Sequence, residues 1–375
     1  YKKRALEATR ELQQGRRGYR AIWKHIMNVS VADLKKNYGN LDVHFDLWMG
    51  ESDAQEYIPD MVDYLKDNGY AHYDQGALVV DVKEETDTKE IPPCMILKSD
   101  GAALYDTTDL ATIIQRMKLY KPDEICYLAD KRQELHFVQC FRCARKAKLV
   151  NDDTALSFIG FGTMNGKDGK PFKTREGGVM RLQYLLESVN EEMLKKITEN
   201  QKAKENLEIS EEEAKETAKI VGLAALKYGD LSNQATKDYV FDIDRFTSFE
   251  GNTGPYVLYT IARINSILKK YSDTCENTEN GDVLPPSAEP EKTLMLALSR
   301  YSDVMLTCFE ELAPHKICAY IYELSNALNH FYHETKIIAE EDKKKQAGYI
   351  SLVTLTRDVL MTCINVLGFS APERM

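Results

Sequence analysis

Residues 98–111 read KSDGAALYDTTDLA, and residues 130–137 read DKRQELHF; both stretches lie where an apolar run passes into a helical pattern. Ile125–Leu128 has the pattern of a short buried strand, a helix is expected over residues 133–148, and Leu156–Phe161 has the pattern of the next strand. This alternation of strands and helices predicts an α/β fold with a largely parallel sheet.

The first hundred residues predict a mixture of helices and short strands. Helices are expected at Arg4–Gln14, Val31–Tyr38 and Gln55–Asn68, a strand at Ala77–Val82, and an imperfect strand-like pattern at Leu41–Leu47. Cys94–Lys98 and Ala102–Tyr105 flank residues 99–101, Ser-Asp-Gly, which is a turn typical of a hairpin. Thr107 or Thr108 is expected to cap the helix that follows.

The last half of the chain is predicted to be helical. Ser210 and Glu213 fit a capping box that opens a second helix within residues 180–228. From Asn252 onward, long amphipathic helices are expected at Tyr256–Tyr271, Glu291–Leu312, His315–Ile338 and Tyr349–Leu367. These patterns predict a helical bundle that follows the α/β region.

Composition sets limits on the class of protein. The 375 residues carry a net charge of −10, with 43% hydrophobic and 29% charged residues, which suits two globular domains. No uninterrupted apolar run predicts a membrane span. The eight cysteines indicate reduced thiols, and Cys140 and Cys143 are expected on neighbouring turns of a helix, not at a zinc or redox site.

The net negative charge argues against nonspecific nucleic-acid binding but leaves room for local basic faces. Residues 131–149 hold six basic side chains and one acidic one, a local charge of +5. Such a stretch can neutralise phosphates, or it can be an ordinary solvated helix face.

Tyr105, Asp109 and Gln133 stand at two successive strand-to-helix crossings. Ligands of open α/β sheets bind outside the carboxyl ends of the strands, so these side chains are expected to converge there. A carboxylate, a phenol and an amide suit a cationic, hydrogen-bonding group such as a guanidinium. From the sequence alone, an acid such as Asp109 is more often a residue that favours the first turn of a helix through the helix dipole.

The loop at residues 165–178 is the second candidate site. From Asn165 to Arg181 the chain has five basic and two acidic residues among several glycines. The order of Gly162, Gly166 and Lys167 excludes a P-loop. The residues leave two interpretations open, a phosphate-binding loop or an exposed basic hairpin.

Several stretches together resemble bacterial arginyl-tRNA synthetases, which are class I aminoacyl-tRNA synthetases. They are SDGAALYDTTDLA (99–111), DKRQELHF (130–137), FGTMNGKDGKPFKTREGG (161–178), LKYGDLSNQATKDYVFDIDRFTSFEGNTGPYVLY (226–259), APHKICAYIYELSNALNHFY (313–332) and LGFSAPERM (367–375). The resemblance runs through essentially the whole chain in order. It implies a partial Rossmann-like catalytic domain at 1–245, with an insertion around 40–95, and an all-α anticodon-binding domain at 246–375.

The resemblance implies roles for individual residues. Tyr105, Asp109 and Gln133 match the family's arginine pocket. The loop at 167–178 resembles the family's form of the KMSKS signature, although Lys170-Pro171-Phe172-Lys173-Thr174-Arg175 departs from it, and Lys173, with Lys170 second, is expected to act in the transition state. Residues expected at the ATP site are His136, Gly162, Met164, Lys167, Lys170, Lys173, Thr174 and Arg175.

The activity implied is arginine–tRNA ligation. ATP is expected as a substrate with Mg²⁺ on its phosphates, and no protein-bound metal is expected. L-arginine and tRNA(Arg) are the other expected partners, without DNA or membrane, for a cytoplasmic monomer. Exposed aromatic and basic residues of the helical domain are expected to contact unpaired bases: Tyr256, Tyr259, Arg263, Tyr320 and Tyr322.

One departure from the family is serious, because no His-x-Gly-His (HIGH) motif occurs in the sequence. We therefore expect a C-terminal part of a longer enzyme that lacks the N-terminal domain and half of the ATP site, and that does not aminoacylate alone. The alternatives are another class I synthetase with a similar helical domain, or a noncatalytic binding module descended from the enzyme.

Overall fold

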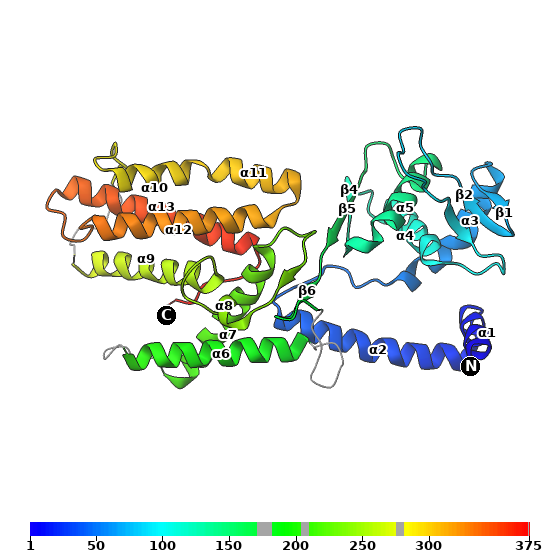
Figure 1. Ribbon diagram of the computed structural model, residues 1–375, viewed down its shortest axis with the longest axis horizontal. Coiled ribbons are helices and arrows are strands. Elements are labelled where there is room, and N and C mark those ends of the chain that lie inside the picture. Colours follow the sequence, from blue (N-terminus) through cyan, green and yellow to red (C-terminus); the bar gives the residue numbers. More distant parts are fainter. Residues whose placement is uncertain (171–181, 204–209, 275–280, 374) are drawn as a thin grey trace. The chain divides into compact units, whose positions relative to one another are not determined.

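The computed structural model describes residues 1–170, 182–203, 210–274, 281–373 and 375. The chain forms two compact units (Figure 1): residues 1–39 with 44–162, and residues 40–43 with 163–375. The change between units falls at residue 162, earlier than the expected division at 245, which stays a prediction. We describe each unit by itself.

The first unit begins with helices and a small sheet. Its elements are α1 (Lys2–Gln13), α2 (Arg17–Asn40), the 3₁₀ turn η1 (Glu51–Tyr57), α3 (Ile58–Asp67), β1 (His72–Asp74), β2 (Ala77–Val80) and β3 (Cys94–Leu97). Helix α2 is much longer than the predicted Val31–Tyr38, and none of its residues is buried. The strand-like interpretation of Leu41–Leu47 is wrong, because α2 continues to Asn40 and an irregular segment follows.

A parallel pair of strands completes this unit. Its elements are α4 (Tyr105–Leu119), β4 (Glu124–Asp130), the 3₁₀ turn η2 (Lys131–Gln133), α5 (Glu134–Lys146) and β5 (Ala155–Phe161). Strands β4 and β5 pair in parallel over their whole length, with α5 as the crossover. The predicted largely parallel sheet is only partly correct, because β1, β2 and β3 form a separate antiparallel sheet. Gln75 and Gly76 alone join β1 to β2, a link that only antiparallel strands allow.

The predicted hairpin at Ala102–Tyr105 is wrong. The Ser-Asp-Gly turn exists, with Gly101 at φ +81° and its amide donating to the Lys98 carbonyl at 2.9 Å. The chain then enters α4 at Tyr105 instead of forming a strand. Leu104 is the N-cap residue, and Thr107, one turn inside, accepts a hydrogen bond from the Leu104 amide at 2.9 Å.

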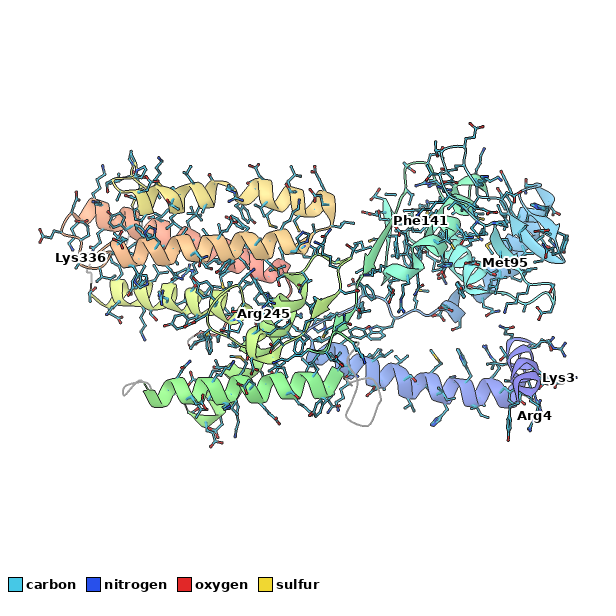
Figure 2. All side chains as sticks on the ribbon, viewed as in Figure 1. Lys3, Arg4, Met95, Phe141, Arg245 and Lys336 are labelled. Atoms are coloured by element: carbon cyan, nitrogen blue, oxygen red, sulfur yellow. The ribbon has the colours of Figure 1, made fainter. Side chains whose placement is uncertain are left out.

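The core of the first unit lies between α3, α4, α5 and the strands. Residues fully buried there include Leu65, Ile96, Leu110 and Ile113. On the face of β4 and β5, Phe137 stacks on Phe158 with ring centroids 4.9 Å apart. Phe141, labelled in Figure 2, extends this aromatic layer next to Phe137. The layer fixes α5 against the parallel strands.

The second unit is almost entirely helical. Its elements are β6 (Met164–Asn165), α6 (Leu182–Ala203), α7 (Glu211–Leu231), β7 (Tyr239–Val240), α8 (Ile243–Phe246), α9 (Gly254–Thr274), α10 (Glu289–Ser299), α11 (Tyr301–Glu311), α12 (Pro314–Glu334) and α13 (Lys343–Val366). The predicted bundle is confirmed, and Figure 1 shows α9 to α13 running alongside one another. The single helix predicted at Glu291–Leu312 is wrong, since the chain breaks at Arg300 into α10 and α11. The Ser210 hydroxyl caps α7 by accepting from the Glu213 amide at 3.2 Å.

Helices α7 and α9 approach each other closely at Gly254. A Cβ on Gly254 would lie 2.5 Å from the Ala224 carbonyl oxygen, so α9 and α7 approach closely at that point.

Helix α13 is the one described helix that is long and apolar enough to cross a membrane, and 56% of its most apolar window is buried inside the protein. Its buried residues, including Leu352, Val353 and Leu360, belong to the bundle core. We therefore interpret α13 as a core helix.

Candidate functional site

The first candidate site is built at the start of α4. Tyr105, Asp106 and Asp109 occupy its first two turns, so the two acids stand three residues apart on one side of the helix. The Thr107 hydroxyl donates to the Ile96 carbonyl at 2.6 Å and is itself fully buried. This bond ties the helix start to β3 and fixes where the acids point.

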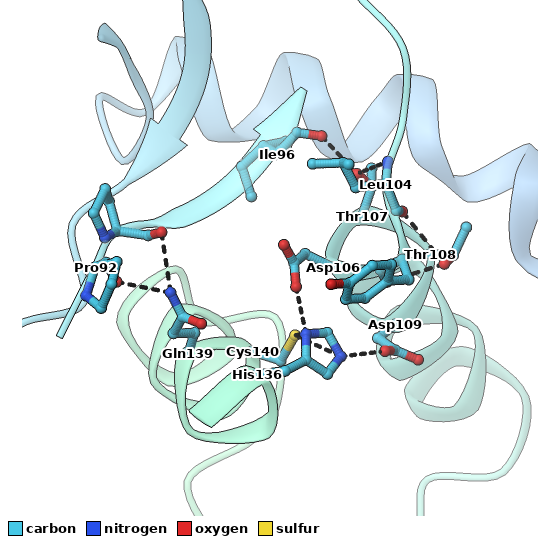
Figure 3. Close-up of polar contacts among 12 residues, drawn as sticks. Pro92, Ile96, Leu104, Asp106, Thr107, Thr108, Asp109, His136, Gln139 and Cys140 are labelled. Carbon is cyan, nitrogen blue, oxygen red and sulfur yellow. Dashed lines mark hydrogen bonds and ion pairs between the residues drawn. The ribbon is translucent and has the colours of Figure 1, made fainter. Parts of the chain in front are cut away.

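His136, on the first turn of α5, lies between the two acids (Figure 3). Its Nε2 is 2.6 Å from Asp109 Oδ2, and its Nδ1 makes a short hydrogen bond with Asp106 Oδ1. The ring of Tyr105 meets the imidazole edge-on, with centroids 5.0 Å apart. Only 11% of the His136 side chain is exposed, against 18% for Asp106 and 22% for Asp109. These three side chains are therefore mostly shielded from water.

The electrostatics of this cluster favour a charged imidazole. Burial lowers the pKa of His136, but hydrogen bonds to Asp106 and Asp109 outweigh that effect and raise the pKa to about 9. Both ring nitrogens then donate a proton, one to each carboxylate. The charges of the three groups sum to −1 at neutral pH.

The donor atoms of this cluster also suggest a metal ion as a ligand. Asp106, His136 and Cys140 offer ligand atoms within 4.8 Å of one another. A metal would require His136 to lose its proton and Cys140 to become a thiolate. Hydrogen bonding to Cys94 and burial both raise the pKa of Cys140, so its thiol keeps the proton. The arrangement therefore favours a proton shared with carboxylates over a metal.

Cys140 and Cys143 are both fully buried on α5, as expected for thiols on neighbouring helical turns. The structure adds a third thiol that the sequence did not predict, because Cys94 on β3 lies within hydrogen-bonding reach of both. The Cys140 sulfur is 3.8 Å from the His136 ring. All cysteines in the part of the chain that the structure describes are free.

Gln133 lies at the end of η2, immediately before α5, and not on the helix itself. Asp130 fixes this turn by accepting from the Arg132 amide at 2.9 Å and its guanidinium at 2.7 Å. The Gln133 side chain is exposed and makes no hydrogen bond to any described residue. The structure thus gathers Tyr105, Asp109 and His136, while Gln133 lies outside this set of contacts, in the turn between β4 and α5.

The residues predicted for ATP are divided between the units. His136 and Gly162 belong to the first unit, and Met164, Lys167 and Lys170 belong to the second. Lys173, Thr174 and Arg175 lie outside the described residues. Lys167 is engaged by Asp242 at 3.0 Å and Asp244 at 3.5 Å, while the Lys170 amide donates to Asp168 at 3.1 Å.

A second candidate site is a pocket of about 460 Å³ in the helical unit. Tyr256, Tyr259 and Arg263 from α9 line it, and all three are partly buried. Their predicted contact with unpaired bases stays a prediction. Asn329 on α12 joins them: it accepts from Arg263 Nη1 at 2.5 Å and donates to the Tyr256 hydroxyl at 2.9 Å. The Arg263 guanidinium also lies over the Tyr259 ring, 5.1 Å from its centroid.

Two other predicted aromatic contacts of the helical unit have different outcomes. Tyr320 is 2% exposed, so its prediction as an exposed residue is wrong; it belongs to the bundle core. Tyr322 is partly buried and packs edge-on against Tyr256, with centroids 5.6 Å apart. No pattern in the sequence indicated Asn329. It lies on the same helix as Tyr322, three residues after Asn326. The Asn326 side chain accepts a hydrogen bond from the Tyr256 hydroxyl at 2.6 Å.

A broader groove of about 770 Å³ adjoins this pocket and shares Arg263 and His333 with it. Lys269, Lys270 and Lys336 line the groove, all exposed. Lys336, labelled in Figure 2, follows the end of α12. Within the described ranges none of these three lysines forms an ion pair.

Comparisons with known proteins agree with this architecture. Residues 1–243 match the family model of class I tRNA synthetases (R), catalytic domain, and residues 257–375 match the DALR anticodon binding domain. The first match covers more than half of the chain. The chain therefore belongs to the class I tRNA synthetases.

Curated relatives narrow the class. An arginine–tRNA ligase of Agathobacter rectalis is 64% identical over 382 residues, and one of Alkaliphilus oremlandii is 57% identical over 372 residues. These alignments cover 100% and 99% of this chain but 63% and 62% of those proteins. The chain belongs to the arginyl-tRNA synthetase family, and it spans just under two thirds of the length of these relatives.

Solved structures share the fold. The arginyl-tRNA synthetase of Plasmodium falciparum superposes with a TM-score of 0.82 at 22% identity, covering 100% of this chain and 62% of that chain. The Thermus thermophilus arginyl-tRNA synthetase gives a TM-score of 0.77 at 20% identity, covering 99% of this chain and 69% of that one.

Proposed function

We propose that this chain supplies the arginine-recognition and tRNA-binding parts of an arginine–tRNA ligase. The observation that carries the proposal is the Asp109 carboxylate, whose Oδ2 lies 2.6 Å from His136 Nε2, with the Tyr105 ring edge-on to the same imidazole. His136 stands in the first turn of α5, just after the parallel strand β4, and ligands of α/β sheets bind beyond the carboxyl ends of the strands. The chain belongs to the arginyl-tRNA synthetase family.

Arginine recognition follows from the chemistry of these groups. Asp109 pairs with the guanidinium, and the Tyr105 hydroxyl and the Gln133 amide satisfy other polar atoms of the substrate. Lysine would present a single ammonium to a site built for a planar fork of donors, which leaves polar groups unpaired. The Asp109 side chain is 22% exposed, so part of it is accessible to a ligand.

ATP is the second substrate, with Mg²⁺ carried on its phosphates. The carboxylate of arginine attacks the α-phosphorus, and pyrophosphate leaves as arginyl-adenylate forms. The 3′-terminal ribose hydroxyl of tRNA then attacks the arginyl carbonyl and releases AMP. Because the substrate is its own nucleophile, the protein supplies positioning and positive charge, for which we propose Lys173 and Lys170, with His136, Gly162, Met164, Lys167, Thr174 and Arg175 lining the nucleotide site.

The tRNA contact that we propose is the pocket of Tyr256, Tyr259, Arg263 and Asn329. Its phenol rings offer stacking surfaces to an unpaired base, and its amide and guanidinium offer edge-on hydrogen bonds. The lysines of the adjoining groove suit the phosphates on either side of that base. On the strength of the family resemblance we propose a cytoplasmic monomer that binds tRNA and not DNA.

We also propose that the chain alone does not charge tRNA, because its sequence contains no His-x-Gly-His motif. The test is arginine-dependent charging of tRNA(Arg), measured for this chain and for the chain joined to a segment of a relative that carries that motif. We expect charging only with the joined protein. Charging by the chain alone at rates ordinary for this class would contradict this part. No charging by either would favour the noncatalytic binding module.

A further inference from the structure

The Asp109 carboxylate has a partner before any substrate arrives. Its Oδ2 receives the hydrogen bond from His136 Nε2 at 2.6 Å. Among the residues that the structure describes, its Oδ1 accepts no hydrogen bond. His136 in turn is held at its other nitrogen by Asp106. One oxygen of Asp109 is thereby fixed, and the other is left for a ligand.

We propose that His136, anchored by Asp106, is a positioning residue for arginine: its ring holds Asp109 so that Oδ1 meets the substrate guanidinium. This inference rests on the proposed function, because it assumes that Asp109 binds arginine. It assigns a role to Asp106, which no pattern in the sequence singled out. It also moves His136 from a wall of the nucleotide site to the arginine pocket.

Charge balance supports this role. Two carboxylates three residues apart on one helix repel each other, and neither can be neutralised by water alone in a half-buried site. The imidazolium between them removes that repulsion and leaves a net charge of −1, which matches the single positive charge of a guanidinium. With a neutral ring in place of His136, the carboxylates would repel and Asp109 would lose its fixed orientation.

The groups that face His136 come from three elements. Asp106, Asp109 and the Tyr105 ring belong to α4, Cys140 belongs to its own helix, and Cys94 on β3 contacts Cys140. Burial lowers the pKa of His136 and the two carboxylates raise it, to about 9. Since the folded-state pKa is raised, the imidazolium stabilises the site fully below about pH 6.5, and this contribution is lost as pH rises through about 9.

The first experiment follows the His136 ring itself by NMR titration of this chain. We expect both ring nitrogens protonated at pH 7 and titration near pH 9, shifted downward in Asp106→Asn. His72, exposed on β1 with Asp81 3.8 Å away, lies outside the cluster and gives the control variant His72→Gln. Titration of His136 near its ordinary value of about 6.5 would overturn the inference without any ligand measurement.

The second experiment measures arginine binding by calorimetry for the wild type, His136→Gln, His136→Ala and the control His72→Gln. We expect about tenfold weaker binding for His136→Ala, partial recovery in His136→Gln, which keeps one donor, and no change for His72→Gln. Wild-type affinity should fall more steeply than that of His136→Gln between pH 8 and 10. Because the α-amino group of arginine titrates in the same range for both proteins, the difference isolates the ring.

The outcomes separate this inference from the proposed function. If wild type and His136→Gln bind arginine equally at pH 7 and show the same pH dependence, the positioning role is wrong and the proposed function stands. If the wild type binds no arginine although His136 titrates near pH 9, the proposed function of the pocket fails, and the positioning role fails with it.

Discussion

In the α/β unit the polar side chains that meet are charged and half-buried, whereas in the helical unit they are amides and phenols around one guanidinium. The two ring nitrogens of the His136 imidazolium each donate a proton to a carboxylate, one to Asp106 and one to Asp109. Arg263 and Tyr256 instead converge on Asn329, whose amide both accepts and donates. The first arrangement suits a small cation, and the second suits a planar base with both donors and acceptors.

The two regions also differ in how their groups are held. The charged cluster draws on α4 and α5 and is anchored to β3 through the Thr107 hydroxyl. The pocket of the helical unit is framed by three long helices, α6, α9 and α12. Because the two sites share no element, arginine binding and tRNA binding should be separable by single substitutions.

The largest difference between the effect on arginine binding and the effect on tRNA binding is expected for Asp109→Asn. Removing the charge that pairs with the guanidinium should weaken arginine binding on the order of a hundredfold, while tRNA binding to the chain stays unchanged. Calorimetry with arginine and filter binding with tRNA(Arg) measure the two quantities. The exposed Asp123→Asn is the matched control. Equal weakening of both ligands would show that the variant had unfolded the chain or that the sites are not separate.

The opposite separation is expected for Gly254→Ala. A new Cβ would lie 2.5 Å from the Ala224 carbonyl oxygen, and neither backbone can yield without moving a helix. We expect the helical unit to lose about 3 kcal/mol of stability and tRNA affinity to fall at 37 °C. Arginine binding should survive. Gly39→Ala, with nothing within 4 Å of the added carbon, is the control.

A milder change is expected for Tyr259→Ala. Removal of one stacking ring should weaken tRNA binding about tenfold, in line with a base–aromatic contact of about 1–3 kcal/mol. Tyr184→Ala, which removes a ring that is 59% exposed on α6, should leave tRNA affinity unchanged. Equal effects of the two substitutions would count against the pocket as a base site.

The smallest effect is expected for Lys270→Ala in the basic groove. Tenfold changes in affinity are not expected, but the slope of log K against log salt should fall by about 0.7 if this lysine neutralises one phosphate. Lys219→Ala, whose side chain already pairs with Glu216 at 3.2 Å, is the control. An unchanged slope for Lys270→Ala would exclude this lysine from the phosphate path.

Local patterns in the sequence predicted the strands β4 and β5 and the bundle helices α12 and α13, since these follow from apolar periodicity. The full length of α2 and the register of β4 with β5 were not predicted. The antiparallel sheet, the break at Arg300 and the start of α4 at Tyr105 were not predicted. They depend on turn geometry and on contacts such as that of Thr107 with Ile96, which no local pattern records.

The same difference applies to the sites. Tyr105 and Asp109 stood out because they follow a strand, and the structure places both beside His136. The sequence did not single out Asp106 or Asn329. Asp106 lies three residues before Asp109, and Asn329 lies three residues after Asn326, which also hydrogen-bonds to Tyr256. Their roles come from residues far away in the sequence, and helical spacing alone could not assign them.

Whether Asp109 recognises a guanidinium is decided by calorimetric titration of this chain with arginine, citrulline and lysine at pH 7. Arginine should bind, while citrulline, which is nearly the same shape but uncharged, and lysine, which is charged but lacks the planar fork, should each bind at least about a hundredfold more weakly. Equal binding of arginine and citrulline, or no binding of arginine, would contradict this role of Asp109.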